Sequence, residues 1–238
     1  MNAAPSIPEA ESQGQTMHSP LASIHLSNLL TYVSLAAGLT AIAAALQGSA
    51  DGAGACIAIA ALADTFDGRF ARRFARTREQ EALGLELDSL VDAISFGLVP
   101  VAATGILLST AKHGVSNAWW IAAMLYAGGA LTRLAFYNVT NSPAHVDNVD
   151  NVDNVDNDDA GTRESGGAFI GVPVPAAALV WSTMLLAPPD ARVAAATALG
   201  TALAMVAPLR ISRPRGTALL IFALWPVTLV IAHVAKQA

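Results

Sequence analysis

The chain has 238 residues, of which 54% are hydrophobic and 13% are charged. Soluble globular domains carry about 25% charged residues, so this composition indicates an integral membrane protein. The net charge of −5 and the single cysteine exclude a basic nucleic-acid-binding domain, a disulfide framework and a cysteine-based metal site.

The N-terminal segment 1–20 contains neither Lys nor Arg and has no long apolar stretch. It therefore lacks the basic and apolar regions of a secretory signal. We expect a disordered leader on the cytoplasmic side, followed by one membrane domain over 21–215.

Seven apolar runs follow the leader, each close to the ~20 residues that cross a bilayer. They lie at roughly 28–47, 53–66, 89–110, 118–138, 169–187, 191–208 and 217–235. The sequence therefore predicts an all-α, polytopic membrane helix bundle. Its core has six helices, and 216–238 forms an additional C-terminal transmembrane helix.

Arginines mark three ends of these runs: the segment 69–78, Arg133, and the segment 210–215. The positive-inside rule places these ends on the cytoplasmic side. The N-terminus is then cytoplasmic and successive runs form hairpins. Because a seventh span leaves Lys236 on the other side, a weak violation of the rule, the last span is the least secure.

The segment 140–167 contains four consecutive Val-Asp-Asn repeats that begin at Val146. It is too polar to span a membrane and too repetitive to pack a core. We expect a solvated, low-complexity cytoplasmic loop.

Four aspartates lie within 29 residues of this apolar chain: Asp64, Asp67, Asp88 and Asp92. Each pair has i,i+3 or i,i+4 spacing, so on a helix its members share one face. Two such helices facing each other would bring four carboxylates to one depth, and cations would have to neutralise them. Oxygen ligands favour Mg²⁺ or Mn²⁺ over Ca²⁺ here, in a two-metal phosphoryl-type site. Alternatively, single aspartates cap helices or pair with neighbouring arginines.

Each helix face that carries a pair of aspartates also carries a glycine. Gly68 follows Asp64 by four residues, and Gly84 precedes Asp88 by four. A glycine removes side-chain bulk where a nucleotide or phosphate could approach. Arg72 lies about two turns after Asp64 and could reach the same face.

These residues form the pattern Asp64-x2-Asp67-Gly68-x2-Ala71-Arg72 … Gly84-x3-Asp88-x3-Asp92. It resembles the signature of the CDP-alcohol phosphotransferase family. Three segments, 88–100, 133–138 and 169–177, resemble its phosphatidylserine synthase branch, and the resemblance covers about 27–215. Two features depart from the family: eleven residues separate Arg72 from Gly84, more than is usual, and no proline precedes Asn28.

The resemblance implies roles residue by residue. Asp64, Asp67 and Asp88 would bind two divalent ions, and Asp92 would deprotonate the acceptor hydroxyl and could also touch a metal. The floor and rim of the CDP site would be formed by Gly68, Ala71, Arg72 and Gly84, with Asn28 and Thr31 contributing from the first helix.

The implied activity is transfer of a phosphatidyl group from CDP-diacylglycerol to L-serine by a homodimer in the bilayer. The site would face the cytoplasm from the inner membrane of a bacterium. Arg133 could bind the serine carboxylate or the lipid phosphate; alternatively it marks topology or pairs with Asp92.

Three other functions stay open. The acceptor could be inositol phosphate, glycerol phosphate or another alcohol, although the Ser95-Phe96-Gly97 continuation favours serine. An ion-coupled transporter would place its acids near the bilayer centre rather than beside an arginine-rich end. A non-catalytic scaffold needs no convergent carboxylates.

Overall fold

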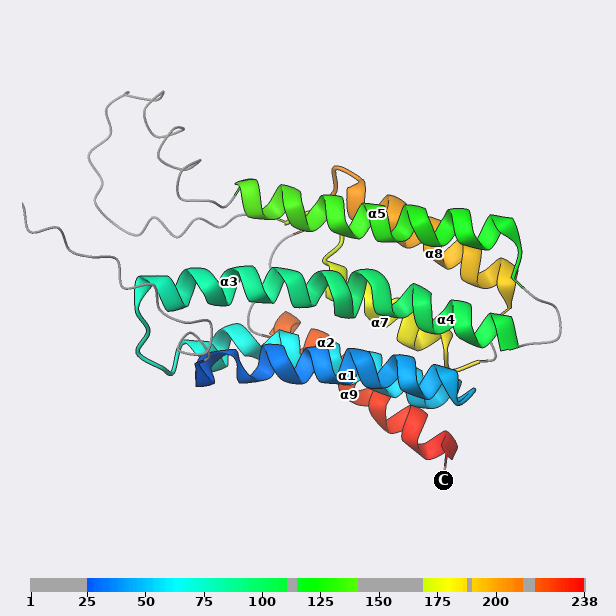
Figure 1. The fold of residues 1–238 in the computed structure, drawn as a ribbon, viewed down its shortest axis with the longest axis horizontal. Coiled ribbons are helices and arrows are strands. Elements are labelled where there is room, and N and C mark those ends of the chain that lie inside the picture. Colours follow the sequence, from blue (N-terminus) through cyan, green and yellow to red (C-terminus); the bar gives the residue numbers. More distant parts are fainter. Residues whose placement is uncertain (1–24, 111–114, 141–168, 188–189, 212–216, 238) are drawn as a thin grey trace, which may run out of the picture.

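The computed structural model describes residues 25–110, 115–140, 169–187, 190–211 and 217–237. The predicted leader and the Val-Asp-Asn tract lie outside these residues. The described chain is an all-α bundle, as the sequence predicted (Figure 1). Its elements are η2 (Leu26–Asn28), α1 (Leu29–Leu46), α2 (Ala50–Ala71), α3 (Arg78–Asp92), η3 (Ala93–Leu98), α4 (Val99–Thr110), α5 (Asn117–Thr140), β1 (Phe169–Ile170), α7 (Val174–Met184), α8 (Ala191–Val206), β2 (Arg210–Ile211) and α9 (Thr217–Gln237).

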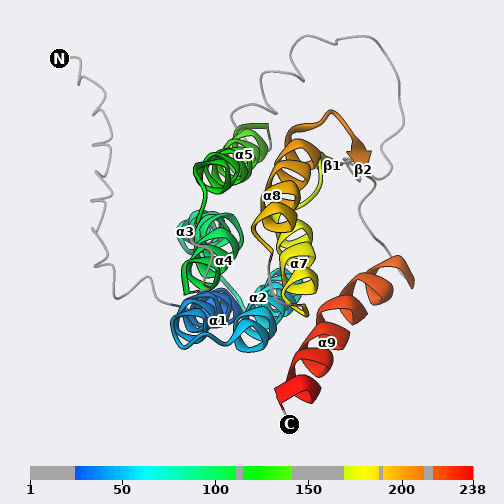
Figure 2. The same cartoon turned by 90° about the vertical axis from the view of Figure 1, so that its right-hand side faces the viewer.

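The helices lie roughly parallel and antiparallel in the bundle. Seen along its axis, α1 and α2 lie side by side at one edge and α5 and α8 at the other, with the α3–α4 rod and α7 between them (Figure 2). Alanines lie on the buried faces of α1 and α2: Ala41 and Ala45 of α1 and Ala53 and Ala58 of α2 are fully buried. Small side chains allow helix backbones to approach closely, which suits packing where lipid supplies no hydrophobic driving force.

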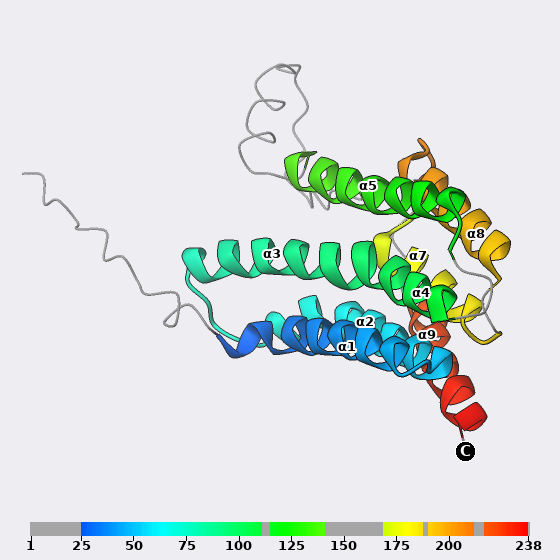
Figure 3. The same cartoon turned by 45° about the vertical axis from the view of Figure 1, so that its right-hand side comes forward.

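Each predicted apolar run overlaps a helix, and the third run overlaps the end of α3, η3 and α4. The third helix begins eleven residues before its apolar run, at Arg78, because a capping box starts it. The hydroxyl of Thr77 accepts from the Gln80 amide at 3.2 Å, and the Gln80 side chain accepts from the Thr77 amide at 3.1 Å. From this start α3, η3 and α4 follow one another as one continuous rod, and α3 projects past the end of α5 (Figure 3).

Within the described residues, two helical segments are long and apolar enough to cross a membrane, Leu26–Leu46 and Glu79–Thr110. The helices Val174–Met184 and Ala191–Val206 are apolar but shorter. The fifth apolar run begins at 169, but its helix begins only at Val174, after Pro173. The residues before it form a short antiparallel pair in which Phe169 faces Ile211.

The C-terminal helix α9 lies outside the main bundle, against α2 and α7 (Figure 2). The fully buried ring of His233 fixes it there: Nδ1 lies 3.0 Å from a carboxylate oxygen of Asp51, to which Lys236 also donates at 3.0 Å. The ring rests on Gly54, where a Cβ atom would overlap it. This contact lies at the opposite end of α2 from Asp64 and Asp67.

Candidate functional site

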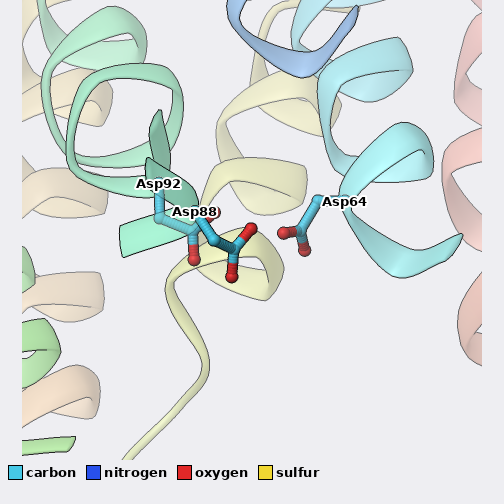
Figure 4. A group of neighbouring side chains, drawn as sticks. All are labelled: Asp64, Asp88 and Asp92. Atoms are coloured by element: carbon cyan, nitrogen blue, oxygen red, sulfur yellow. The ribbon is translucent and has the colours of Figure 1, made fainter. Parts of the chain in front are cut away.

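Helices α2 and α3 carry the four aspartates. Asp64 and Asp67 lie in the last two turns of α2, and Asp88 and Asp92 lie in the last two turns of α3. The α2–α3 connection reverses the chain, and α3 runs back past the end of α2 until its aspartates lie opposite those of α2. Figure 4 shows Asp64 pointing across to Asp88 and Asp92.

The four carboxylates converge. One oxygen from each of Asp64, Asp88 and Asp92 lies within 4.8 Å of the others, and all three residues are half-buried. Asp67 lies beside this triad and interacts with Asp88, while Asp64 interacts with Asp92. The structure therefore brings together all four predicted aspartates, but the tightest triad includes Asp92 rather than Asp67.

This donor set fits a divalent cation. Carboxylates this close repel one another unless a proton or a cation lies between them. Hard oxygen donors without nitrogen or sulfur are the ligands that Mg²⁺ and Mn²⁺ prefer. The acid cluster can therefore hold a divalent metal ion.

Thr31 and Asn28 are buried side chains, and Thr31 contacts an aspartate directly. Both lie at the start of the first helix. The Thr31 hydroxyl donates to Oδ2 of Asp67 at 3.3 Å. Asn28 accepts from the hydroxyl of Ser27 at 3.1 Å. Thr31 thus orients a carboxylate, a role that sequence spacing alone did not indicate.

The two glycines differ in their surroundings. A Cβ on the exposed Gly68 would meet only a terminal nitrogen of Arg72, at 3.8 Å, so this surface is open. A Cβ on Gly84 would lie 3.2 Å from Oδ1 of Asn28. Gly84 therefore lets α3 approach the start of the first helix, and in this structure the Asn28 side chain fills the space predicted for a ligand.

Two arginines in the connection between α2 and α3 are candidates to bind a phosphate, and they lie in different places. Arg72 ends α2, beside Gly68, and Ala71 precedes it as the last residue of the helix. Arg76 lies nearer Gly84 and pairs with Glu81 at 3.7 Å. Of these two arginines, Arg72 is therefore the one beside the open surface.

Helix α5 contributes to the same end of the bundle. Arg133 lies close enough to Asp92 to interact with it electrostatically. One turn further, Asn138 donates to the hydroxyl of Ser89 at 2.9 Å and joins α5 to α3 beside Asp88. The segments 133–138 and 88–100 both carry the family resemblance, but only the fold reveals that they meet.

The residues that favoured serine as acceptor do not line the open site. Ser95, Phe96 and Gly97 are fully buried in η3, between α1 and α5. These three residues can therefore influence the choice of acceptor only indirectly, by fixing the position of η3.

A family model described as CDP-alcohol phosphatidyltransferase matches residues 24–234, a range that includes most of α9. A protein of Mycobacterium leprae (strain TN), named "CDP-diacylglycerol--serine O-phosphatidyltransferase", is 37% identical over 155 residues, which are 65% of this chain and 44% of that protein. The protein of that name from Mycobacterium tuberculosis (strain ATCC 25618 / H37Rv) is 40% identical over 114 residues, 48% of this chain and 37% of the relative. The matches thus span less than half the length of these curated relatives.

Proposed function

This chain belongs to the CDP-alcohol phosphatidyltransferase family, and we propose that it transfers a phosphatidyl group from CDP-diacylglycerol to the hydroxyl of L-serine. The products are phosphatidylserine and CMP. The observation that carries this proposal is the convergence of Asp64, Asp88 and Asp92, with Asp67 beside them. The relatives' names supply the acceptor.

In this reaction the serine oxygen forms a bond to the phosphorus that bears diacylglycerol. The bond from that phosphorus to the CMP oxygen breaks, and CMP leaves with the electron pair. Asp92 accepts the serine proton, a general-base role for a carboxylate placed at the reacting oxygen.

The remaining aspartates, Asp64, Asp67 and Asp88, would hold two divalent ions, Mg²⁺ or Mn²⁺, and Asp92 would also be able to contact one of them. When bound, such ions neutralise charge on the diphosphate and on the leaving CMP. Thr31 keeps the Asp67 carboxylate turned into the cluster through its hydrogen bond.

The CDP group lies over the open surface of α2. Gly68 and Ala71 form its floor, and Arg72 reaches the diphosphate from the rim. Gly84 and Asn28 close the far side, where they pack against each other. Arg133, next to Asp92, binds the serine carboxylate or the lipid phosphate as a fork of donors.

The substrate's acyl chains stay in a bilayer while its headgroup enters this end of the bundle. Apolar helices and family membership support a membrane protein. Because the arginine-bearing ends of α2 and α5 lie at the same end of the bundle as the aspartates (Figure 1), the positive-inside rule supports a cytoplasmic site. We assign the protein to a bacterial inner membrane as a homodimer.

The test is CMP release from CDP-diacylglycerol by the purified protein, with L-serine, inositol phosphate or glycerol phosphate as acceptor. Serine alone should support turnover. Asp88→Asn and Asp92→Asn should each lower kcat by about 10²-fold or more. Glu86→Gln, which removes an exposed carboxylate from the same helix, is the control and should keep activity. Near-normal turnover by either aspartate variant would refute the mechanism.

A further inference from the structure

The rod formed by α3, η3 and α4 is not a regular helix throughout. Directly after Asp92 it widens into the π-helical segment η3, and the amide of Val99 bonds to the carbonyl of Ile94, five residues back. Such π-helical turns inside α-helices occur frequently at functional sites. This one separates the helix that carries Asp88 and Asp92 from the buried helix α4.

Pro100 explains why the wide turn forms. A proline has no amide hydrogen, and its ring collides with the carbonyl four residues earlier. In this chain that carbonyl belongs to Phe96, which is fully buried. A regular α-helix would leave the Phe96 carbonyl without a donor, and an unsatisfied buried carbonyl is costly.

The missing donor comes from another helix. The hydroxyl of Tyr126, on α5, donates to the Phe96 carbonyl oxygen at 2.7 Å, and both residues are fully buried. The Tyr126 ring is held separately, edge to face against Trp181 with ring centroids 5.2 Å apart. The hydroxyl can therefore be removed without removing the packing of the ring.

Close packing fixes η3 from two sides. Towards α1, the hydroxyl of Ser95 donates to the Ser34 carbonyl at 3.4 Å, and a Cβ on Gly38 would lie 3.0 Å from that hydroxyl oxygen. Towards α5, a Cβ on Gly97 would touch the Ala130 methyl at 3.4 Å. The wide turn is thus built into the contact between three helices.

The wide turn sets the direction in which the preceding helix faces. Successive residues of an α-helix are rotated by about 100°, so removing the one-residue expansion would turn α3 by about that angle relative to α4. Asp88 and Asp92 would then no longer point at Asp64 across the gap. Their orientation depends on keeping η3 in its π-helical form.

We propose that Tyr126 is a positioning residue whose hydroxyl, by bonding to the Phe96 carbonyl that a regular helix would leave without a donor at Pro100, holds the wide turn that aims Asp88 and Asp92 at the metal-binding cluster. The segment 95–100 then sets the rotation of α3 relative to α4 and does not contact the acceptor. This inference rests on the proposed function only in requiring that the cluster binds a divalent cation.

The test is Mn²⁺ binding to the purified full-length protein, measured by calorimetry without substrate. Tyr126→Phe should weaken binding about 10-fold, as the loss of supporting groups around metal ligands does. The matched control is Ser182→Ala. It also removes a fully buried hydroxyl that donates to a backbone carbonyl, that of Gly54 at 2.8 Å, but far from the aspartates. Its Mn²⁺ affinity should stay within twofold of the original.

If Tyr126→Phe does not fold, a second variant, Pro100→Ala, tests whether the wide turn supports Mn²⁺ binding. It restores an amide at position 100 and permits a regular turn, so it should keep the helical circular dichroism signal yet bind Mn²⁺ about 10-fold more weakly. Unchanged affinity in every folded variant, equal weakening in Ser182→Ala, or no Mn²⁺ binding by the original protein would each overturn the inference. If the expected binding pattern holds but serine yields no CMP, the proposed function fails and the inference stands.

Discussion

At the scale of single residues, two of the four aspartates interact with side chains from other helices. Thr31 donates to Asp67, and Arg133 lies beside Asp92. Supporting groups of this kind tune metal affinity because they fix the direction of the ligand oxygens. The chemistry of the cluster therefore depends on the first helix as well as on α2 and α3.

Replacing Thr31 tests this support. Thr31→Val keeps the shape of the side chain but removes the hydrogen bond to Asp67. We expect the Mg²⁺ concentration that gives half-maximal activity to rise about 10-fold. Thr40→Val is the control, since the Thr40 hydroxyl bonds only to the Ala36 carbonyl of its own helix. Equal metal requirements in the two variants would contradict this role.

Gly68 offers a second residue-scale prediction. An alanine there meets only Arg72 at 3.8 Å, so Gly68→Ala should fold normally and even gain up to ~1 kcal/mol of helix stability. If the CDP group lies on this surface, the added methyl should raise KM for CDP-diacylglycerol several-fold. A KM equal to that of the original protein would remove Gly68 from the binding surface.

At the scale of elements, the apolar runs predicted the helices except most of α3, and they did not predict how the helices meet. Apolar runs located the helices because length and hydropathy are local properties. The wide turn after Asp92 required a hydroxyl from Tyr126 on another helix, and the role of Gly84 required Asn28. Both pairings join residues that are far apart in the sequence, so no local sequence pattern indicates them. The four aspartates could be predicted to converge because their helical spacing already placed each pair on one face.

The docking of α9 is an element-scale feature with its own test. Gly54→Ala would place a methyl group against the ring of His233. Overpacking of this kind typically costs about 2 kcal/mol, so we expect a lower melting temperature and faster proteolytic cleavage in 217–237. Gly200→Ala, where an added Cβ meets nothing within 4 Å, should melt as the original protein does. Equal melting of both variants would mean that this contact does not secure α9.

At the scale of the whole molecule, the described bundle has two different ends. One end gathers the aspartates, Arg72, Arg76 and Arg133, and the other holds the contact between α9 and the start of α2. This arrangement suits a headgroup reaction at one membrane surface, since the aspartate cluster and the three arginines lie together at one end. The apolar α1 and the rod of α3 to α4 supply the lengths that a bilayer requires.

Our main proposal is that the aspartate cluster makes this protein a metal-dependent serine phosphatidyltransferase. Its most direct test is the formation of isotope-labelled phosphatidylserine from CDP-diacylglycerol and labelled L-serine, measured by mass spectrometry before and after metal removal. We expect product with Mg²⁺ or Mn²⁺, none after EDTA, and recovery when the metal is restored. Labelled product that forms at the original rate in EDTA would contradict the metal dependence. No labelled product with either metal would contradict the serine phosphatidyltransferase activity.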